Sequence, residues 1–228
     1  MNVKIFNKLQ EIIQHSPQVM IDKQSLKVAV SGVFGVDIDA KSYNSIVELS
    51  YEISQAVLKK YYTETWKPQT QTYIHSGFGI ADEINALEPT SVVDIGCGYN
   101  EFKDKINNLI GVDAFNEHAD IISSTVDYNP ENKHDIAICF DSVNFGSADN
   151  VFFELAHIVS KIVNPGGFIF FRANTKDTQH CKAEQWIDFF EWSPEFVVNS
   201  ARVLGCIPVI CKQDNDSLFF VWKTHSGS

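Results

Sequence analysis

The chain of 228 residues lacks the long apolar segments that mark membrane and secreted proteins. No uninterrupted apolar run approaches the roughly 18 residues that a membrane-spanning helix needs. The first residues, from Met1 to Lys8, contain no secretory apolar region followed by a small-residue cleavage site. We therefore expect a cytoplasmic protein that does not bind a membrane.

Cysteines suited to cross-linking or metal binding are lacking as well. The five cysteines are odd in number and include no C-x-x-C pair, which argues against a disulfide framework and against a zinc site. Cys139 and Cys206 lie inside apolar runs, where a free thiol behaves as a small hydrophobic side chain. We expect no bound metal.

Basic residues are few for a protein of this size. The 18 Lys and Arg residues are outnumbered by 29 Asp and Glu residues, which gives a net charge of −11. A large contact with duplex nucleic acid draws its affinity from Lys and Arg, so this balance argues against one. Small-molecule or protein partners are favoured, with a small molecule as the leading candidate.

What the sequence does contain is a pair of apolar runs that each end in an acid. The first run leads into Asp94-Ile-Gly96-Cys-Gly98, and the second ends at Asp113, nineteen positions after Asp94. Glycines in such a turn let the backbone approach a ligand, and a carboxylate at the tip of the next parallel strand accepts the ribose hydroxyls. The pattern predicts a nucleoside site.

The residue three positions after the second glycine separates two classes of nucleoside ligand. A dinucleotide fingerprint places a third glycine there, so that a helix N-terminus can face a pyrophosphate. This chain has Glu101 instead. A carboxylate in the first helical turn repels a pyrophosphate and is tolerated near a sulfonium cation, so a dinucleotide is disfavoured.

The chain from Ser91 onward alternates strand-like and helical segments, which predicts a Rossmann-like α/β fold. We expect a seven-stranded, mostly parallel sheet that ends in an antiparallel hairpin. Too few residues follow the first and second strands for full crossover helices, so both helices should be reduced or lost. The expected later elements are strands at 120–124, 135–140, 167–172, 206–212 and 218–223 and a helix at 151–163.

Residues 1–80 predict a mainly helical cap, and residues 81–228 predict the Rossmann-like domain. Apolar residues recur at helical spacing over 41–62, and 3–15 and 80–87 are further helix candidates. The run 27–34 is rich in valine and is interpreted as a strand that pairs with 19–21. The segment 63–79 is aromatic, polar and irregular.

Asp94-Ile-Gly-Cys-Gly resembles motif I of the class I S-adenosylmethionine-dependent methyltransferases, with Asp113 in the place of the ribose acid of that family. Segments around Asp113, Asn144, Arg172 and 186–192 also resemble a group of short methyltransferases carried by bacteriophages. The resemblance covers roughly residues 88–223. It implies an enzyme of the host cytoplasm that uses S-adenosylmethionine, and it names no acceptor.

The resemblance also implies roles for particular residues. Asp113 would hold the ribose, while Gly96 and Gly98 shape the methionine pocket. The full set of cofactor-binding candidates is Asp94, Gly96, Cys97, Gly98, Asp113, Ala114, Thr125, Val126, Asp141 and Ser142, the last four of which would line the adenine side.

Asn144 and Arg172 are the candidate catalytic residues, because each follows a strand at the carboxyl edge where open α/β sheets bind ligands. Asn144-Phe145 resembles the Asn/Asp-Pro-Pro-aromatic motif of amino methyltransferases, although both prolines are absent. Loop capping by Asn144 remains an alternative. Arg172 could neutralise an acidic acceptor or form an internal salt bridge in this acidic chain.

Two other functions fit the same cofactor pocket. One is an aminopropyltransferase-like enzyme that uses a decarboxylated form of the cofactor. The other is a protein that binds S-adenosylmethionine in a non-catalytic role. Methyl transfer from a sulfonium is an in-line displacement that positioning can accelerate, so the lack of a recognisable catalytic triad does not count against it.

Overall fold

The computed structural model of the chain describes residues 2–67, 77–175, 185–214 and 217–226. These residues form two compact units. The first takes in residues 2–66, 145–147 and 185–189, and the second takes in the rest. None of the helices within these ranges is long and apolar enough to cross a membrane.

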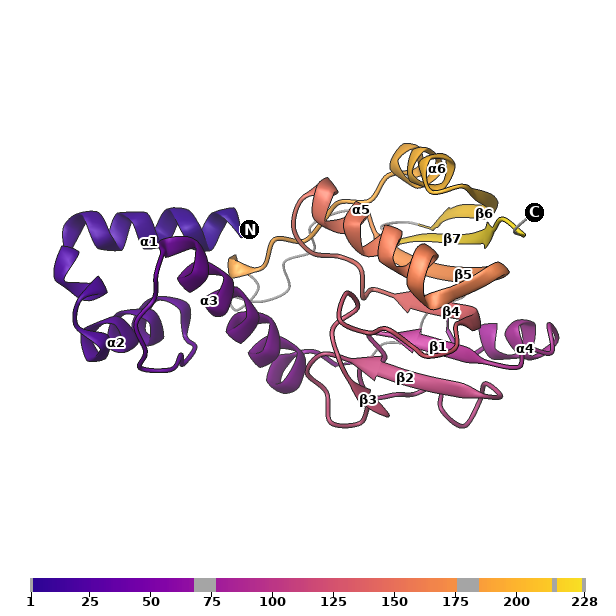
Figure 1. Ribbon diagram of the computed structural model, residues 1–228, viewed down its shortest axis with the longest axis horizontal. Coiled ribbons are helices and arrows are strands. Elements are labelled where there is room, and N and C mark those ends of the chain that lie inside the picture. The colour runs from indigo at the N-terminus through magenta and orange to yellow at the C-terminus, as the bar shows by residue number, and fades with distance from the viewer. Residues whose placement is uncertain (1, 68–76, 176–184, 215–216, 227–228) are drawn as a thin grey trace. The chain divides into compact units, whose positions relative to one another are not determined.

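The second unit is built on a single sheet of seven strands among the described residues, in the order β3-β2-β1-β4-β5-β7-β6 (Figure 1). Neighbouring strands from β3 to β5 run parallel, while β7 runs antiparallel to both β5 and β6. This confirms the predicted Rossmann-like sheet and its terminal hairpin. The strands are β1 (Val92–Ile95), β2 (Leu109–Asp113), β3 (Ile121–Ile122), β4 (His134–Phe140), β5 (Val163–Asn174), β6 (Cys206–Asp214) and β7 (Ser217–Thr224).

Helices cover both faces of this sheet (Figure 1). Helix α5 (Ala148–His157), its π-helical continuation (Ile158–Ile162) and α6 (Pro194–Val203) share one apolar core with alternate residues of the central strands. Helix α4 (Ile80–Asn85) packs into the core on the other face. Because successive strand residues point to opposite faces, the continuous apolar runs of β1 and β4 supply both cores.

The connections after β1 and β2 contain turns and no helix, as their length predicts. A chain of hydrogen bonds among buried and half-buried side chains supports the loop between β3 and β4. The Tyr128 hydroxyl lies 2.8 Å from Nε2 of His134, and Nδ1 of His134 lies 2.6 Å from Oγ of Ser91. His157 of α5 is hydrogen bonded to the carbonyl oxygen of Tyr128 at 3.0 Å. This loop therefore packs against α5 without a crossover helix.

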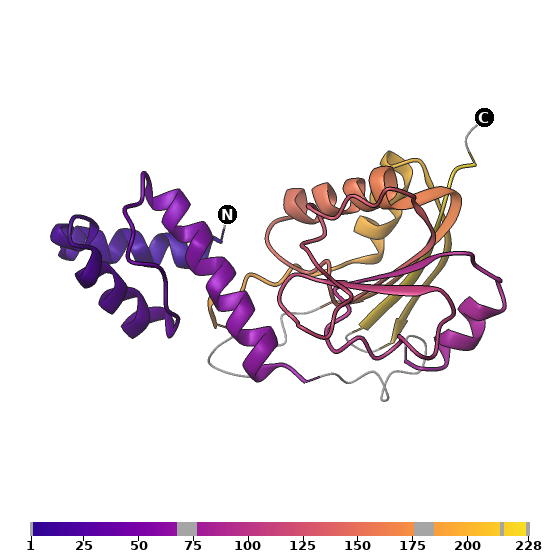
Figure 2. The ribbon, with the colours of Figure 1, turned by 60° about the horizontal axis from the view of Figure 1, so that its bottom comes forward.

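The first unit is helical (Figure 2). Side chains cap its helices, because Asn2 accepts the N–H of Ile5 and Ser45 accepts that of Glu48. The helices predicted at 3–15 and 41–62 are confirmed, the second beginning later at its Ser45 cap, and the helix predicted at 80–87 is found in the second unit as α4, ending at Asn85. The elements of the unit are α1 (Val3–His15), a 3-10 turn η1 (Pro17–Met20), α2 (Lys23–Phe34), α3 (Ile46–Lys60) and a π-helical turn η2 (Tyr61–Thr65).

The predicted strand at 27–34, and its pairing with 19–21, are wrong. Residues 23–34 form helix α2, whose N-terminus is capped by the Asp22 carboxylate. Leu26, Val30 and Phe34 recur every four residues and are buried on one side of the helix, and Gly35 ends it at φ 69°. Helical spacing and two good caps prevail over the strand propensity of the valines.

A segment far along the sequence completes the first unit. Ile187 is 2% exposed in the core of that unit, and Trp186 packs edge-on against Phe34 with ring centroids 4.8 Å apart. The Asp188 carboxylate accepts the N–H of Val3 at 3.0 Å, at the start of α1. The N-terminal helices and residues 185–189 thus share one core.

Candidate functional site

The turn after β1 is shaped by its two glycines. Gly96 and Gly98 have φ angles of 70° and 54°, in the left-handed region that side chains disfavour. A Cβ atom at Gly96 would overlap with the Cβ atom of Ser142, which follows β4. Only glycine fits there, so the turn after β1 lies directly against the end of β4.

Asp113 fastens this turn to the end of β2. One carboxylate oxygen accepts the N–H of Gly98 at 3.0 Å, and the other accepts those of Phe115 and Asn116 at 2.8 and 2.9 Å. A carboxylate has about four lone-pair directions, so three backbone donors leave room for one more partner. Asp113 therefore orders the glycine turn and can also accept a ribose hydroxyl.

Asp94 is buried beneath the turn, with 4% of its surface exposed. Burial, together with the charge of Asp113, raises the pKa of the Asp94 carboxyl to about 7. Burial also raises the pKa of the neighbouring Cys97 thiol. The Cys97 thiol is therefore neutral at pH 7, whereas the Asp94 carboxyl is close to its midpoint there, and a nearby cation would favour its charged form.

We expect Asp94→Asn to stabilise the protein at alkaline pH. The folded pKa lies above the unfolded value, so the stability that Asp94 contributes is present at acid pH and is lost as pH rises through 7. Between pH 5 and pH 8 the free energy of unfolding of the wild type should fall by about 3 kcal/mol relative to that of the variant. This fall corresponds to the roughly two pH units between pH 5 and the folded pKa. Urea unfolding at both pH values measures this. A difference equal at both pH values would contradict it, and the exposed Asp104→Asn is the control.

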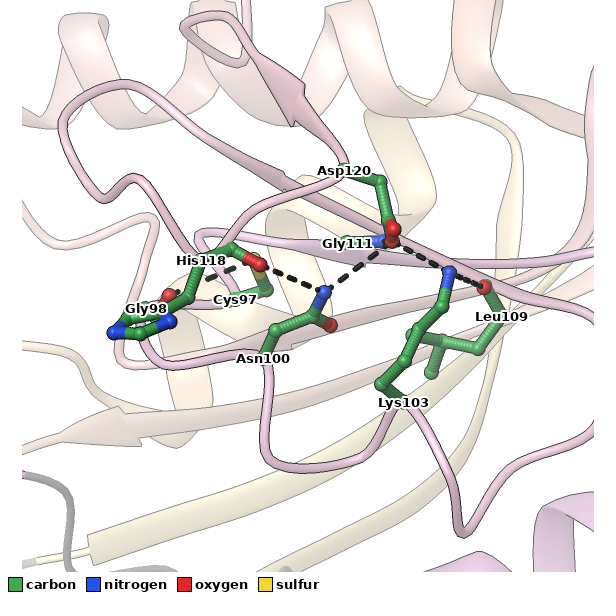
Figure 3. A network of polar contacts seen from close by, with 8 residues as sticks. All are labelled: Cys97, Gly98, Asn100, Lys103, Leu109, Gly111, His118 and Asp120. Atoms are coloured by element: carbon green, nitrogen blue, oxygen red, sulfur yellow. Dashed lines mark hydrogen bonds and ion pairs between the residues drawn. The ribbon is translucent and has the colours of Figure 1, made fainter.

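A polar network links the connection after β1 to β2 and to Asp120 (Figure 3). One oxygen of Asp120 accepts Nζ of Lys103 at 2.7 Å, the N–H of Gly111 at 2.8 Å and Nδ2 of Asn100 at 3.3 Å. Partial burial alone would raise the pKa of Asp120, but these three donors hold it below its usual value. Nδ2 of Asn100 also donates to the carbonyl oxygen of His118 at 3.1 Å.

This network was not predicted from the sequence, although Gly111 offers a signal for it. Glycine inside a strand often marks a close approach by other atoms. A Cβ atom at Gly111 would overlap with Oδ1 of Asn100, two residues beyond Gly98. Lys103 adds a second link, donating to the carbonyl oxygen of Leu109 at 3.0 Å. These contacts tie the helix-free connection after β1 to β2 and to Asp120.

Polar groups without partners gather at the end of β4. Oδ1 of Asp141 and Oγ of Ser142 are buried and have no hydrogen-bond partner among the described residues. Buried polar atoms of this kind are costly, and native proteins satisfy nearly all of them. Because Ser142 lies against Gly96, a polar ligand held by the glycine turn could supply the missing partners.

The two candidate catalytic residues are both buried, and the side chain of each is hydrogen bonded to another side chain. Arg172 is 8% exposed and pairs with Asp141, donating from Nε at 2.9 Å and also from a terminal nitrogen. Asn144 is 4% exposed, and its side-chain oxygen accepts Nε1–H of Trp192 at 3.1 Å. The internal salt bridge considered for Arg172 is present.

The other candidates lie around the ends of β2 and β3. Ala114 is half-buried directly after Asp113. Thr125 and Val126 are half-buried in the turn after β3, and neither shares a hydrogen bond with Asp113 among the described residues. The structure thus brings Gly96, Gly98, Asp113 and Ser142 together and leaves the adenine side less defined.

Among the described residues no group of three or more histidine, cysteine or acidic side chains could hold a metal ion. Four of the cysteines are described, and all four are free. Cys139 and Cys206 are buried, as their apolar surroundings predict.

Solved structures share this architecture at low sequence identity. The 1,6-didemethyltoxoflavin-N1-methyltransferase of Burkholderia thailandensis, with bound 1,6-didemethyltoxoflavin and S-adenosylhomocysteine, matches with a TM-score of 0.59 and 14% identity over 83% of this chain and 95% of that chain. The fold is the Rossmann-like methyltransferase fold. The N-methyltransferase NodS of Bradyrhizobium japonicum, with S-adenosylhomocysteine, matches with a TM-score of 0.52 and 11% identity over 75% of this chain and 97% of that chain.

A third match shows that this fold serves more than one reaction. The [4+2]-cyclase SpnF matches with a TM-score of 0.53 and 11% identity, covering 76% of this chain and 97% of that chain. No protein-family model and no curated protein sequence matches the chain. The likeness at these identities is one of fold, so function has to be argued from the site.

Proposed function

We propose that the chain is an S-adenosylmethionine-dependent methyltransferase that acts on a small-molecule acceptor. The observation that carries this proposal is the hydrogen bond between the Gly98 N–H and Asp113, which joins a glycine turn after β1 to an acid at the end of β2. This is the arrangement that a nucleoside needs at the carboxyl edge of a parallel sheet. The fold neighbours that hold S-adenosylhomocysteine support the choice of nucleoside.

The residues present fit this cofactor. Asp113 has room for one ribose hydroxyl, and the buried atoms of Asp141 and Ser142 lack partners that a polar ligand would provide. Burial and the charge of Asp113 raise the pKa of Asp94, and a cationic group nearby would offset both effects and favour its carboxylate form. When bound, the cofactor supplies an electrophilic methyl group on a sulfonium.

In this proposal the chain's own residues act chiefly by positioning. Asp113 would fix the ribose, the Gly96–Gly98 turn would shape the methionine pocket, and the Arg172–Asp141 pair would fix the loop after β4. Holding two reactants in line lowers the barrier without a proton transfer. A general base is needed only for an acceptor that keeps its proton at neutral pH.

S-adenosylhomocysteine should bind this protein, and NAD should not. Glu101 stands where a dinucleotide site has its third glycine, and the turns after β1 provide no helix N-terminus for a pyrophosphate. Isothermal titration calorimetry with both ligands tests the proposal. Micromolar binding of NAD with no response to S-adenosylhomocysteine would overturn it.

We propose that Asn144 touches the acceptor and that Arg172 acts through Asp141. The Asn144 oxygen already accepts from Trp192, so in this proposal the amide nitrogen is the atom that meets the acceptor. Asn144→Ala should therefore lower kcat about tenfold or more, while the dissociation constant of S-adenosylhomocysteine stays near that of the wild type. A loss of cofactor affinity equal to the loss of turnover would assign Asn144 to the cofactor.

We also propose that different parts of the chain bind the acceptor and the cofactor. Residues 1–80 and the loops after β4 and β5 would select the acceptor, and residues 81–228 would bind the cofactor. The bacteriophage-type resemblance and the cytoplasmic location are predictions from the sequence. Mass spectrometry of a small-molecule extract incubated with the protein and methyl-labelled S-adenosylmethionine would identify the acceptor.

A second function is favoured by one observation. SpnF shares the fold and is a [4+2]-cyclase, so a protein of this fold need not catalyse methyl transfer. A chain that binds S-adenosylmethionine without transferring its methyl group, or that transfers an aminopropyl group, would also bind S-adenosylhomocysteine in the calorimetric titration. Appearance of labelled methyl in an extract component separates methyl transfer from both.

A further inference from the structure

The loop between β3 and β4, residues 123–133, contains a single buried residue. Tyr128 is 7% exposed, and its side chain belongs to the apolar core that the sheet shares with α5, whereas the other residues of the loop are half-buried or exposed. The Tyr128 hydroxyl is hydrogen bonded to His134 of β4, and its carbonyl oxygen accepts from His157 of α5. A segment with so few buried contacts opens more readily than the sheet beside it.

The imidazole of His134 lies between two hydroxyl groups. Nδ1 is 2.6 Å from Oγ of Ser91, and Nε2 is 2.8 Å from the hydroxyl of Tyr128. A neutral imidazole has one donor nitrogen and one acceptor nitrogen, and a hydroxyl complements either, so the neutral ring makes both hydrogen bonds. His134 is 3% exposed, so these two partners take the place of water around the ring.

A proton on His134 would disturb this arrangement in two ways. An imidazolium donates from both nitrogens, so the hydroxyl that had donated to the ring must turn its hydrogen toward another acceptor. Within the described ranges neither the Ser91 nor the Tyr128 hydroxyl has a second hydrogen-bond partner. The proton would also place a positive charge in a buried position, where charge is costly unless it is paired.

The groups around His134 provide little compensation for that charge. Asp135, the next residue of β4, favours the charged ring, but its two oxygens accept from Thr90 and Asn164. Burial therefore prevails and lowers the pKa of His134. The other neighbouring elements contribute the following groups: Tyr128 and Lys133 from the loop, Ser91 before β1, Val163 from β5, and His157 and Glu154 from α5. Burial raises the pKa of Glu154 to about 7, so in acid it supplies no counter-charge.

We propose that the contact between His134 and Tyr128 is an acid-sensitive switch, in which a proton on His134 releases Tyr128 and opens residues 123–133 while the sheet stays folded. The folded pKa of His134 lies below the unfolded value of about 6.5, so the stability that the contact contributes is present above pH 6.5 and is lost as pH falls below it. Asp94 has the opposite dependence. The inference does not depend on the proposed function. Under that function, the opened loop would take Thr125 and Val126 from the adenine side.

Hydrogen–deuterium exchange of the full-length protein, followed by mass spectrometry and corrected for the intrinsic exchange rate at each pH, tests the switch. Between pH 7.5 and pH 5.5 the protection of residues 123–133 should fall about three- to tenfold, tenfold being the most that a group with a pKa of about 6.5 in the open state can cause over this range. Peptides from β1 and β5 should keep their protection. Unchanged protection of the loop, or an equal loss in the loop and the sheet, would overturn the inference.

His134→Gln should remove the pH dependence of the loop, because an amide keeps a donor and an acceptor and takes up no proton in this range. His157→Gln is the matched variant. His157 donates to the carbonyl oxygen of Tyr128, and its N–H is present in both protonation states, so this variant should keep the fall in protection. Loss of the fall in His157→Gln, or its persistence in His134→Gln, would refute the switch.

A second measurement applies if circular dichroism shows that His134→Gln does not fold. Nuclear magnetic resonance titration of the wild-type protein gives the pKa of the His134 ring directly. A value below 6.5, with the resonances of residues 123–133 changing over the same pH range, would support the switch. A value at or above 6.5 would overturn it, because the folded protein would then favour the proton.

Discussion

Gly96→Ala should weaken S-adenosylhomocysteine binding roughly thirtyfold or more and lower the free energy of unfolding by about 2–5 kcal/mol. A left-handed backbone costs a residue with a Cβ atom roughly 1–2 kcal/mol. The overlap of that atom with the Cβ atom of Ser142 adds about 1–3 kcal/mol. Relief of the overlap would move the turn away from β4, so the cofactor would lose its fitted surface. Calorimetry and urea unfolding measure the two effects.

Gly35→Ala provides the matched control. Gly35 has a φ angle of 69°, close to the 70° of Gly96, and a Cβ atom there would meet no other atom within 4 Å. This variant should lose only the backbone part of the stability and none of the cofactor affinity. Ser142→Gly, combined with Gly96→Ala, should restore part of the stability. If both alanine variants were equally destabilised, the overlap with Ser142 would not contribute to the loss of stability in Gly96→Ala.

Asp113→Ala should weaken S-adenosylhomocysteine binding by roughly a hundredfold. A hydrogen bond to a charged group contributes about 1.5–3 kcal/mol, and each 1.4 kcal/mol corresponds to a tenfold change in affinity. The variant loses the proposed bond to the ribose and releases the N–H of Gly98, so the glycine turn is freed as well. Calorimetry measures the dissociation constant, and circular dichroism checks that the protein stays folded.

Asp113→Asn should fall between the wild type and the alanine variant. An amide keeps one acceptor oxygen and turns the other position into a donor, so it cannot accept from both Gly98 and the pair of N–H groups after β2. Asp104→Asn, at an exposed acid in the same stretch of sequence, should leave the affinity unchanged. An unaltered dissociation constant in Asp113→Ala would show that Asp113 does not face the ribose.

The sheet and its hairpin are predictable because strand signals are local. Buried parallel strands read as short apolar runs between turn residues, and the hairpin has a turn-rich segment between two such runs. Gly96, Gly98 and Asp113 could be placed on the same grounds, since the glycines follow one parallel strand and Asp113 ends the next. For α2 the decisive features were the Asp22 cap and the burial of one helix side, which compete with the strand preference of valine.

The polar contacts that support the site could not be predicted from residue spacing. Asp120 accepts from Lys103 and Asn100 across 17 and 20 positions, in a loop without regular structure. Polar partners at such separations obey no period, so only the folded chain reveals them. The pairing of Arg172 with Asp141 is similar, because β4 and β5 must first lie side by side before the two residues meet.

The late arrival of residues 185–189 sets the order in which the molecule can fold. Asn2 and Trp186 are joined by a hydrogen bond across 184 positions, and Ile187 fills the core of the N-terminal helices. A ribosome adding about 5–20 residues per second needs roughly 6–24 s to travel from residue 66 to residue 187. Throughout that interval the three helices have been synthesised but lack part of their core. We expect them to acquire full resistance to proteases only late in translation, when nascent chains are already long enough to include β1 to β5.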